Sequence, residues 1–269
     1  MFPELSDVSN VLEELAPIAY AEEWDNPGLQ VGQPSQVIHN IFIALDPTIE
    51  ALKAASEVNA QLLLTHHPLL FKPLRHLDLT TAPGKIILEA VHSGIAIVAA
   101  HTNLDVARGG INDMLAQVFS LRDIAPLQER TDLDDRGVGL GRIGLLPQSE
   151  TLDEIAENVK GTWGLRTVKV VGEKNRLINR VAVVGGSGGG LVSTAAKAGA
   201  ELLITGDIGH HHALEAVARG LALIDAGHFY TEKRALSLFA EPFETALRKR
   251  GYDVAVAFFE NEKCPERYL

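Results

Sequence analysis

The fold of this chain follows from a stretch of sequence that occurs twice, first as IFIALDPTIEALKAASEVNAQLLLT at residues 41–65 and again as VAVVGGSGGGLVSTAAKAGAELLIT at residues 181–205. The two copies are related by a constant offset of 140 residues. Each copy continues through a predicted helix into a further apolar strand, GIAIVAA at 94–100 and GLALIDA at 220–226. Strands that alternate with helices in this way are typical of parallel or mixed sheets covered by helices. We therefore predict an α/β protein with two similar lobes from an internal duplication, facing each other across a cleft.

The pattern of apolar residues predicts the individual elements and the boundary between the lobes. In the first copy we expect strands at 40–45, 60–65 and 95–100 and helices at 48–59, 83–93 and 109–119. In the middle section we expect a strand at 137–146, a helix at 151–159 and a hairpin built from 167–171 and 178–184. In the second copy we expect a helix at 190–198, strands at 201–205 and 221–225, a helix beginning at His228, and a C-terminal helix at 233–250 and strand at 253–259 that complete that lobe. The predicted lobes are residues 1–124 and 125–269.

Composition and charge limit the classes of function. A net charge of −11 disfavours sequence-independent binding to nucleic acid, which depends on Lys and Arg replacing phosphate counterions, although a local basic patch stays compatible with it. The single cysteine, Cys264, excludes internal disulfides and thiolate metal sites, so a metal ion would need nitrogen and oxygen ligands. No apolar run reaches the ~20 residues of a membrane span. The N-terminal MFPELSDVSNVLEELAPI predicts an amphipathic helix from Ser6 or Ser9 and not a signal peptide, so we expect a cytoplasmic protein without a membrane role.

Histidines follow two strands of the first copy. His66 and His67 come directly after a buried strand, and His101 follows the next strand, with Asp105 four residues further on. Consecutive side chains of an extended backbone point to opposite sides, so the histidine pair can bind different metal ions, or both rings can be loop histidines that bind backbone carbonyl groups. Because open α/β folds place their sites at the carboxyl ends of strands, we expect these side chains to meet there.

The second copy leads into GHFYTE at residues 227–232, which carries His228 and Glu232. If a helix begins here, these two side chains are four residues apart on one face and can reach the same ion, although by itself the pair is more typical of an ordinary surface pair. With the first copy, the candidate ligands number at least five: His66, His67, Asp105, His228 and Glu232, with His101 as a sixth candidate. A single tetrahedral zinc needs only four ligands, which favours two divalent ions per chain, chosen from zinc, iron, manganese, nickel or cobalt.

Two ions ~3.5–4 Å apart activate a bridging water and bind an oxygen-rich substrate, which is the chemistry of hydrolysis. Glu232 and His101 are the candidates for moving protons in such a reaction. His101 could instead be a further ligand or could orient a ligand, and the sequence does not choose between these roles.

Two further motifs lie in the second copy. The glycine run VVGGSGGG at 183–190 follows a strand and precedes a helix, where backbone N–H groups can bind phosphate, but close approach of the two lobes explains it equally well. The run His210-His211-His212 should fan around the axis of a helix, so we expect it to line the rim of the site or to cap Asp207.

Four segments of the chain resemble the signature sequences of the NIF-three-like dinuclear-metal family, whose members are often labelled GTP cyclohydrolase I type 2 homologues. The segments are WDNPGLQVG at 24–32, THHPLLFKPL at 65–74, AAHTNLDVARGGIND at 99–113 and IDAGHFYTE at 224–232. The resemblance implies that His66, His67, Asp105, His228 and Glu232 bind two metal ions. It also implies two α/β lobes in a toroidal homo-hexamer, in a compact form without the extra domain that longer members insert. Gly209 stands where a lysine is common in the family, and His212 is additional.

These observations lead to two hypotheses about function. The first is a metal-dependent hydrolase that uses a metal-bridging hydroxide on a nucleotide or a related phosphorylated small molecule, for which the resemblance suggests opening of the guanine ring of GTP. The alternative is a ring-shaped metal-binding scaffold or metal chaperone that interacts with DNA-repair or transcription proteins. Binding of nucleic acid in the ring would require a basic inner surface.

Overall fold

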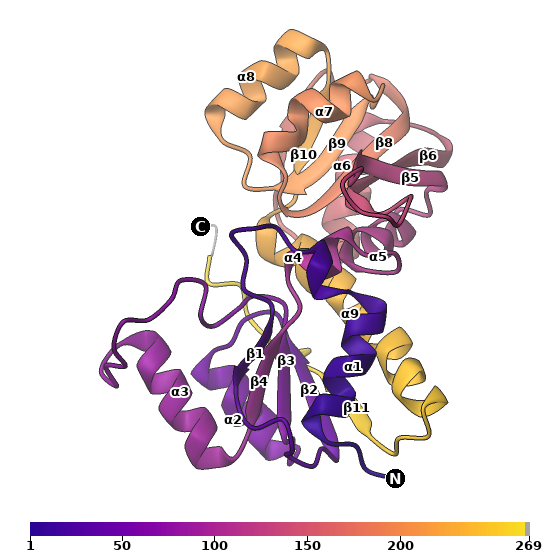
Figure 1. Cartoon of the computed structure of the whole chain (residues 1–269). Coiled ribbons are helices and arrows are strands. Elements are labelled where there is room, and N and C mark those ends of the chain that lie inside the picture. The colour runs from indigo at the N-terminus through magenta and orange to yellow at the C-terminus, as the bar shows by residue number, and fades with distance from the viewer. Residues whose placement is uncertain (267–269) are drawn as a thin grey trace. The chain divides into compact units, whose positions relative to one another are not determined.

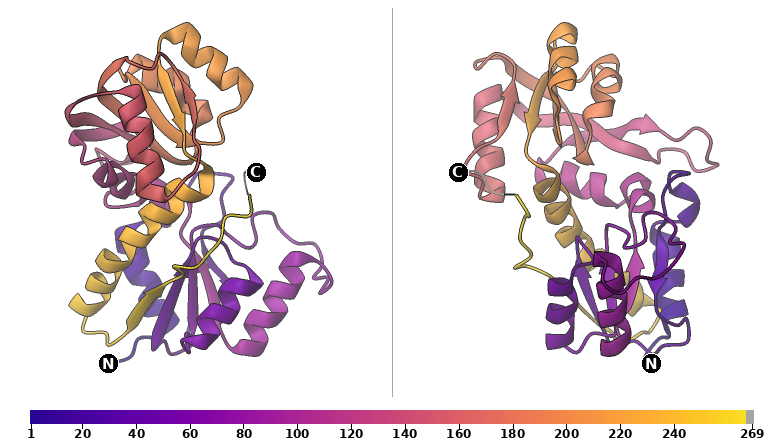
Figure 2. Two further views of the ribbon diagram at one scale, coloured as in Figure 1. Left: turned by 180° about the vertical axis from the view of Figure 1, so that it is seen from behind. Right: turned by 90° about the vertical axis from the view of Figure 1, so that its left-hand side faces the viewer.

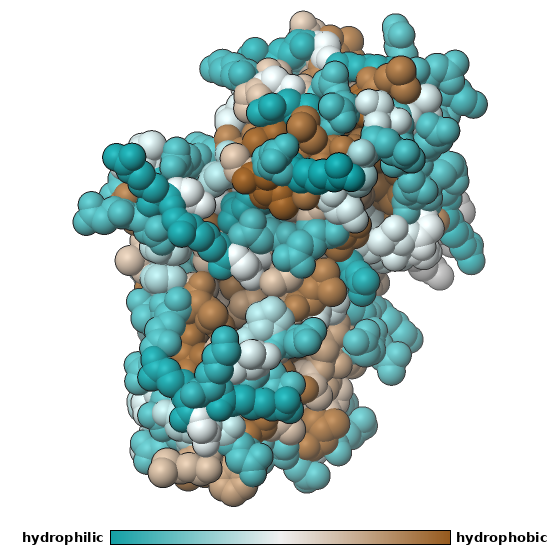
Figure 3. All heavy atoms as spheres, turned by 90° about the vertical axis from the view of Figure 1, so that its right-hand side faces the viewer, coloured by the Kyte–Doolittle hydropathy of each residue, from teal (hydrophilic) through white to brown (hydrophobic). Residues whose placement is uncertain are grey.

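The computed structural model of the chain describes residues 1–266 and contains two compact α/β units (Figure 1). The first unit comprises Met1–Ala107 and the C-terminal segment from Leu236, and the second unit comprises Arg108–Ala235. Across the described residues, no helix combines the length and the apolar character needed to cross a membrane. Figure 3 shows one face of the surface, on which hydrophilic side chains predominate and hydrophobic side chains gather in separate patches.

The first unit is built on a five-stranded sheet in the order β1-β4-β3-β2-β11. The strands are β1 (Gly28–Val31), β2 (Asn40–Ala44), β3 (Leu62–Thr65), β4 (Ala96–Ala99) and β11 (Ala255–Phe258). All neighbours pair in parallel except β1, which lies antiparallel at the edge. The carboxyl ends of β3 and β4 therefore lie side by side at one edge of the sheet.

Helices cover both faces of this sheet (Figures 1 and 2). They are α1 (Leu5–Leu15), α2 (Ile49–Glu57), α3 (Ala82–Ser93), the short α4 (Thr102–Val106) and the C-terminal part of α9 (His228–Lys249), with a single 3₁₀ turn at Ile18–Tyr20. Phe42, Leu63 and Ile97 pack against α2 and α3, whereas the alternate positions, such as Ile41 and Leu64, are buried outside that cluster. The period of two along each strand therefore supplies both faces with apolar side chains.

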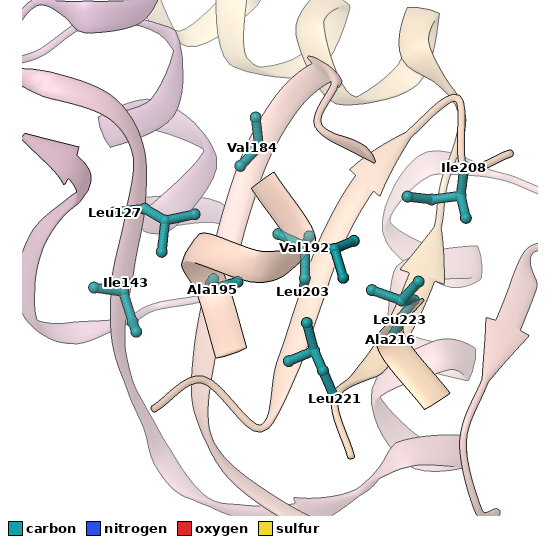
Figure 4. Packing of buried hydrophobic residues seen from close by; sticks show 11 residues of the cluster. Leu127, Ile143, Val184, Val192, Ala195, Leu203, Ile208, Ala216, Leu221 and Leu223 are labelled. Atoms are coloured by element: carbon teal, nitrogen blue, oxygen red, sulfur yellow. The ribbon is translucent and has the colours of Figure 1, made fainter. Parts of the chain in front are cut away.

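The second unit is built on a six-stranded sheet in the order β5-β6-β8-β9-β10-β7. The strands are β5 (Arg122–Glu129), β6 (Gly139–Thr151), β7 (Lys169–Val171), β8 (Leu177–Ser187), β9 (Leu202–Gly206) and β10 (Ala222–Asp225). Its helices are α5 (Ile111–Val118), α6 (Leu152–Trp163), α7 (Val192–Lys197), α8 (His210–Arg219) and the first residues of α9, with a 3₁₀ turn at Gly189–Leu191. In Figure 4, Leu203 and Leu223 of adjacent strands lie beside Val192, Ala195 and Ala216 of α7 and α8, in one continuous core.

Local capping sets several helix boundaries. Helices α2, α3 and α6 begin after a threonine whose side chain accepts a backbone N–H bond: Thr48, Thr81 and Thr151. Helices α3, α6 and α8 end at a glycine in the left-handed conformation: Gly94, Gly164 and Gly220. Such caps satisfy backbone groups that have no partner inside the helix.

The internal duplication is confirmed down to the register of the strands. Ile41 pairs with Leu62 in the first unit, and Val181 pairs with Leu202 in the second, so the offset of 140 residues holds for both partners. The succession β2-α2-β3-α3-β4 in the first unit corresponds to β8-α7-β9-α8-β10 in the second.

The repeat also includes the antiparallel edge strand that precedes each copy. Strand β1 pairs with β4, and β7 pairs with β10. Each edge strand is followed by a glycine with an unusual positive φ, +132° at Gly32 and +134° at Gly172. A Cβ at Gly32 would lie 2.6 Å from Ala96 Cβ, and a Cβ at Gly172 would lie 3.2 Å from Ala222 Cβ. Only glycine fits this approach to the neighbouring strand.

Three predictions about the second lobe were wrong. Segments 167–171 and 178–184 form no hairpin, because β7 pairs with β10 whereas β8 pairs with β6 and β9. The C-terminal strand pairs with β2 and belongs to the first unit. The helices expected from His228 and at 233–250 are one continuous helix, α9. The compact units consequently differ from the predicted division at residues 124 and 125, since the chain returns to the first unit within α9.

Candidate metal centre

The first unit gathers three histidines at the carboxyl ends of β3 and β4. His66 and His67 follow β3, and His101 lies between β4 and α4. A backbone hydrogen bond of 2.9 Å from Ala100 N to Thr65 O extends the pairing of the two strands to this point. One ligand nitrogen from each of the three rings lies within 4.8 Å of the other two. The predicted meeting of these strand ends is therefore confirmed for His66, His67 and His101.

Each of the three rings is fixed through its Nδ1 atom. Nδ1 of His66 lies 2.8 Å from the carbonyl oxygen of Ala100. Nδ1 of His67 lies 2.8 Å from Asp46 Oδ1, and Nδ1 of His101 lies 2.8 Å from Asp25 Oδ1. Since all three partners are acceptors, each Nδ1 carries a proton, and in the neutral form of each ring the lone pair resides on Nε2. This is the tautomer that metal-binding histidines adopt when a carboxylate or carbonyl orients them.

Asp105 of α4 adds a carboxylate to this group. Its Oδ1 lies 3.6 Å from His66 Nε2, and the His66 side chain is 0% exposed. Two ligands of one tetrahedral ion, at bond lengths near 2.1 Å, are separated by roughly 3.4 Å. The spacing of Asp105 and His66 is longer than a hydrogen bond and close to that value. These residues thus fit a divalent ion.

The second unit presents a histidine and a glutamate in the first turn of α9. His228 Nε2 lies 3.0 Å from Glu232 Oε2, and the two residues are four apart on one helix face, as predicted. Nδ1 of His228 lies 2.8 Å from Asp207 Oδ2, so the neutral form of this ring also has its lone pair on Nε2, on the side of Glu232. Asp207 holds a left-handed backbone conformation with φ of +56°, which is uncommon for a residue other than glycine.

The glycine run of the second unit is explained by close packing. A Cβ at Gly186 would overlap Glu232 Oε1, and a Cβ at Gly188 would overlap Thr205 Oγ1. Gly186 also has a φ of +64° and donates its N–H to Thr231 Oγ1 at 3.0 Å. These contacts all lie within the second unit, so local packing explains the glycines, an interpretation that the sequence did not offer. Gly186 allows the Glu232 carboxylate to lie beside the backbone of β8.

The histidine run begins α8, where His210 and His211 are exposed and His212 packs on Gly189. The expectation that one of them caps Asp207 is not met, because the Asp207 carboxylate accepts the hydrogen bond from His228.

Hydrogen bonds stabilise the charge on Asp25, which orients His101. Burial would raise the pKa of this carboxyl group, but hydrogen bonds from His101 and Thr102 outweigh burial and lower the pKa to about 2. Thr102 donates both its N–H, at 3.0 Å, and its hydroxyl to Asp25 Oδ2. Asp25 is therefore an anion over the whole physiological pH range and holds His101 in one orientation.

The carboxylates that orient His67 and His101, Asp46 and Asp25, were missed in the sequence. Asp25 lies in WDNPGLQVG, which the sequence marks only as a family segment. Asp46 comes two residues after β2, whose carboxyl end is parallel to that of β3. The rule that placed the histidines at this edge could have placed Asp46 there as well, because it applies to every parallel strand of the sheet.

The fold and the site define a two-unit α/β protein whose candidate metal ligands follow the carboxyl ends of its strands. The chain belongs to the Duf34/NIF3 (NGG1p interacting factor 3) family, whose model matches residues 3–265. It is 35% identical over 266 residues to a Clostridium perfringens protein named GTP cyclohydrolase 1 type 2 homolog, covering 99% of this chain and 100% of that protein. A protein of the same name from Clostridium acetobutylicum is 32% identical over 265 residues, and the match covers 98% of each chain.

Solved structures agree with this assignment. The crystal structure of a Bacillus cereus protein related to NIF3 superposes with a TM-score of 0.93 at 25% sequence identity, and the match covers 100% of both chains. The family resemblance and the α/β fold class predicted from the sequence are therefore confirmed.

Proposed function

We propose that this chain is a metal-dependent hydrolase whose centre holds two divalent ions through His66, His67, Asp105, His228 and Glu232. The observation that carries the proposal is the common state of the four histidines His66, His67, His101 and His228. Each has Nδ1 bound to a carboxylate or carbonyl oxygen at 2.8 Å, so each presents Nε2. Nitrogen and oxygen donors of this kind suit zinc, iron, manganese, nickel or cobalt.

Two divalent ions supply a hydrolase with a water of lowered pKa and with an electrophile for the substrate's oxygen atoms. The chain's own residues orient the reactants and move protons. His101, with Nδ1 fixed by Asp25, presents Nε2 either as a further ligand or as a proton acceptor. Glu232, 4% exposed and backed by Gly186, is the other group able to carry a proton.

The substrate class that we propose is a nucleotide or a related phosphorylated small molecule. The names of the two Clostridium relatives support a purine nucleotide and ring opening of the GTP type. Hydrolysis of a phosphoester uses the same ions and the same donors, so both reactions belong in the experiment.

The experiment is a hydrolysis screen of nucleoside mono-, di- and triphosphates with zinc-, iron- and manganese-loaded protein. Glu232→Gln keeps the shape of the side chain and removes its charge, and His92→Ala, at an exposed site on α3, is the matched control. We expect turnover by the wild type and by His92→Ala, and a loss of at least ~100-fold in Glu232→Gln, the usual scale for a group that transfers protons. Loaded protein without turnover of any nucleotide would contradict the hydrolase.

That outcome would favour the alternative function, a metal-binding scaffold or metal chaperone. A homo-oligomer, in the form of the toroidal hexamer that the family resemblance implies, is compatible with both functions.

Light scattering on the eluting peak of a size-exclusion column measures the molar mass of the oligomer. A hexamer has six times the chain mass of 29.0 kDa.

A further inference from the structure

Two exposed aromatic side chains lie beside the histidines of the first unit. Trp24 is 57% exposed and Phe71 is 46% exposed. Their ring centroids are 5.6 Å apart with an interplanar angle of 52°, and the Trp24 ring lies 6.0 Å from the His101 ring at 72°. Because both rings are about half exposed and tilted to each other, they offer aromatic surface to solvent on which another planar ring can stack.

Hydrogen bonds hold both aromatic residues in place. Asn26 Nδ2 donates to the Leu70 carbonyl at 2.7 Å, and Leu70 N donates to Gln30 Oε1 at 3.0 Å, so the segments that carry Trp24 and Phe71 are joined twice. On the other side of Trp24, Asp25 is bound by His101 and Thr102. The exposure of the two rings is therefore a feature of an ordered surface.

The charge of the neighbouring segment points to an anionic ligand. Residues 65–76, THHPLLFKPLRH, contain Lys72 and Arg75 and no carboxylate, in a chain whose net charge is −11. Both side chains are exposed. Cations close to an exposed aromatic surface match a ligand that combines a planar ring with phosphate groups.

We infer that Trp24 and Phe71 form a stacking platform for the base of a nucleotide, with Lys72 and Arg75 binding its phosphates. The platform borders His101, so a base on it lies next to the first-unit ligands. The inference rests on the proposed function for its substrate class. It adds residues that recognise the base and that neither bind metal nor transfer protons.

The test measures binding and does not depend on turnover. The chain has two tryptophans, Trp24 and Trp163. Trp163 lies in the second unit against Phe119, and its indole nitrogen is buried without a hydrogen-bond partner among the described residues, so Trp163→Phe should be tolerated. In that background Trp24 is the only tryptophan, and its fluorescence reports stacking directly.

The probes are GTP, guanosine and inorganic triphosphate, titrated into the metal-loaded Trp163→Phe protein. We expect quenching by GTP and guanosine, and weaker or no quenching by triphosphate. By calorimetry, Trp24→Ala and Phe71→Ala should each lower the affinity for guanosine about tenfold, as expected for the loss of one base–aromatic stack. The double variant Lys72→Ala/Arg75→Ala should lower the affinity for GTP and for triphosphate and leave the affinity for guanosine unchanged. Trp163→Phe alone should bind all three probes as the wild type does.

Guanosine affinity that is unchanged in both aromatic variants would overturn the inference, as would the absence of binding by all three probes. A change of oligomeric state in Trp24→Ala or Phe71→Ala would assign the rings to a contact between copies of the chain and also overturn it; the exposed Leu74, Leu77 and Leu79 further along the segment make this control necessary. Failure of the proposed function is separate, since it appears as loaded protein that binds guanosine but hydrolyses no nucleotide.

Discussion

In the first unit the residues after β3 are His66 and His67, whereas in the second unit the corresponding end of β9 carries Gly206 and Asp207. The last residue of the next strand differs as well. It is Ala99 in β4, which pairs with Thr65, but Asp225 in β10, which pairs with Thr205. Asp225 is buried and binds Lys169 Nζ at 2.6 Å. The strands and helices of the two units thus repeat, while the residues at their carboxyl ends do not.

The difference shows which positions of a duplicated frame are constrained. Positions inside the ladders must match the neighbouring strand, so small and branched apolar residues recur in both copies. Residues beyond the last ladder pair face no such partner and can acquire separate roles. The common outcome is a histidine fixed through Nδ1, reached with Asp25 and Asp46 in the first unit and with Asp207 in the second.

The largest effect is expected at the paired edge glycines, which test whether the frames are equivalent. Gly32→Ala and Gly172→Ala should each lower the free energy of unfolding by about 2–5 kcal/mol, because both place a Cβ against the neighbouring strand at a φ near +130°. Gly94→Ala is the control, since its φ is +66° and no atom lies within 4 Å of the added Cβ, and it should cost only about 1 kcal/mol. Urea denaturation measures all three. If only one of the two edge-glycine variants lost stability, the two units would not be equivalent at this position.

The second prediction concerns Gly186, which lies beside the proposed ligands His228 and Glu232. Gly186→Ala should displace the Glu232 carboxylate and remove at least one metal ion per chain, and should also destabilise the fold by about 1–3 kcal/mol. Gly190→Ala, where nothing lies within 4 Å of the added Cβ, should retain the wild-type metal content. Metal analysis of both purified variants decides this. Full metal content in Gly186→Ala would mean that Glu232 needs no support from the glycine run.

The orienting carboxylates allow a direct comparison of the two units. Asp46→Asn and Asp207→Asn each weaken the bond that fixes one histidine, so each should lower metal affinity by roughly 10- to 100-fold. Asp134→Asn, at an exposed position between β5 and β6, should leave the affinity unchanged. Competition with a chromophoric chelator measures the affinities. An effect confined to one variant would show that only one unit uses its anchored histidine for metal.

The smallest expected effect is the pH dependence that Asp25 contributes. The pKa of this group is about 2 in the fold and 3.8 in its ordinary state, so its ionised form stabilises the fold above pH 4, and the contribution is lost as the pH falls from about 4 to 2. The difference in unfolding free energy between the wild type and Asp25→Asn should therefore shrink over this range. Urea denaturation of metal-free protein provides the values. A difference that is constant with pH would contradict the low pKa.

Sequence alone predicted the repeated strands and helices because their period and order are local properties. It also predicted that His66, His67 and His101 would converge, since parallel strands bring their carboxyl ends together. It did not predict the partners of β7 and β11. Only residues 172–176 separate β7 from β8, and this short connection suggested a hairpin. Strand β7 pairs instead with β10, which is remote in sequence, so the local pattern could not indicate the pairing. Asp25 was missed because its role depends on a contact with a residue 76 positions away.

The number of metal ions bound per chain tests the proposed centre most directly. The wild type, His66→Ala, His228→Ala and the control His92→Ala are purified without chelator, reloaded with zinc and measured by elemental analysis. We expect about two ions per chain in the wild type and in His92→Ala, and fewer in both His66→Ala and His228→Ala, because both residues are proposed ligands. Absence of bound metal in the reloaded wild type, or an unchanged content in both ligand variants, would contradict the proposed centre.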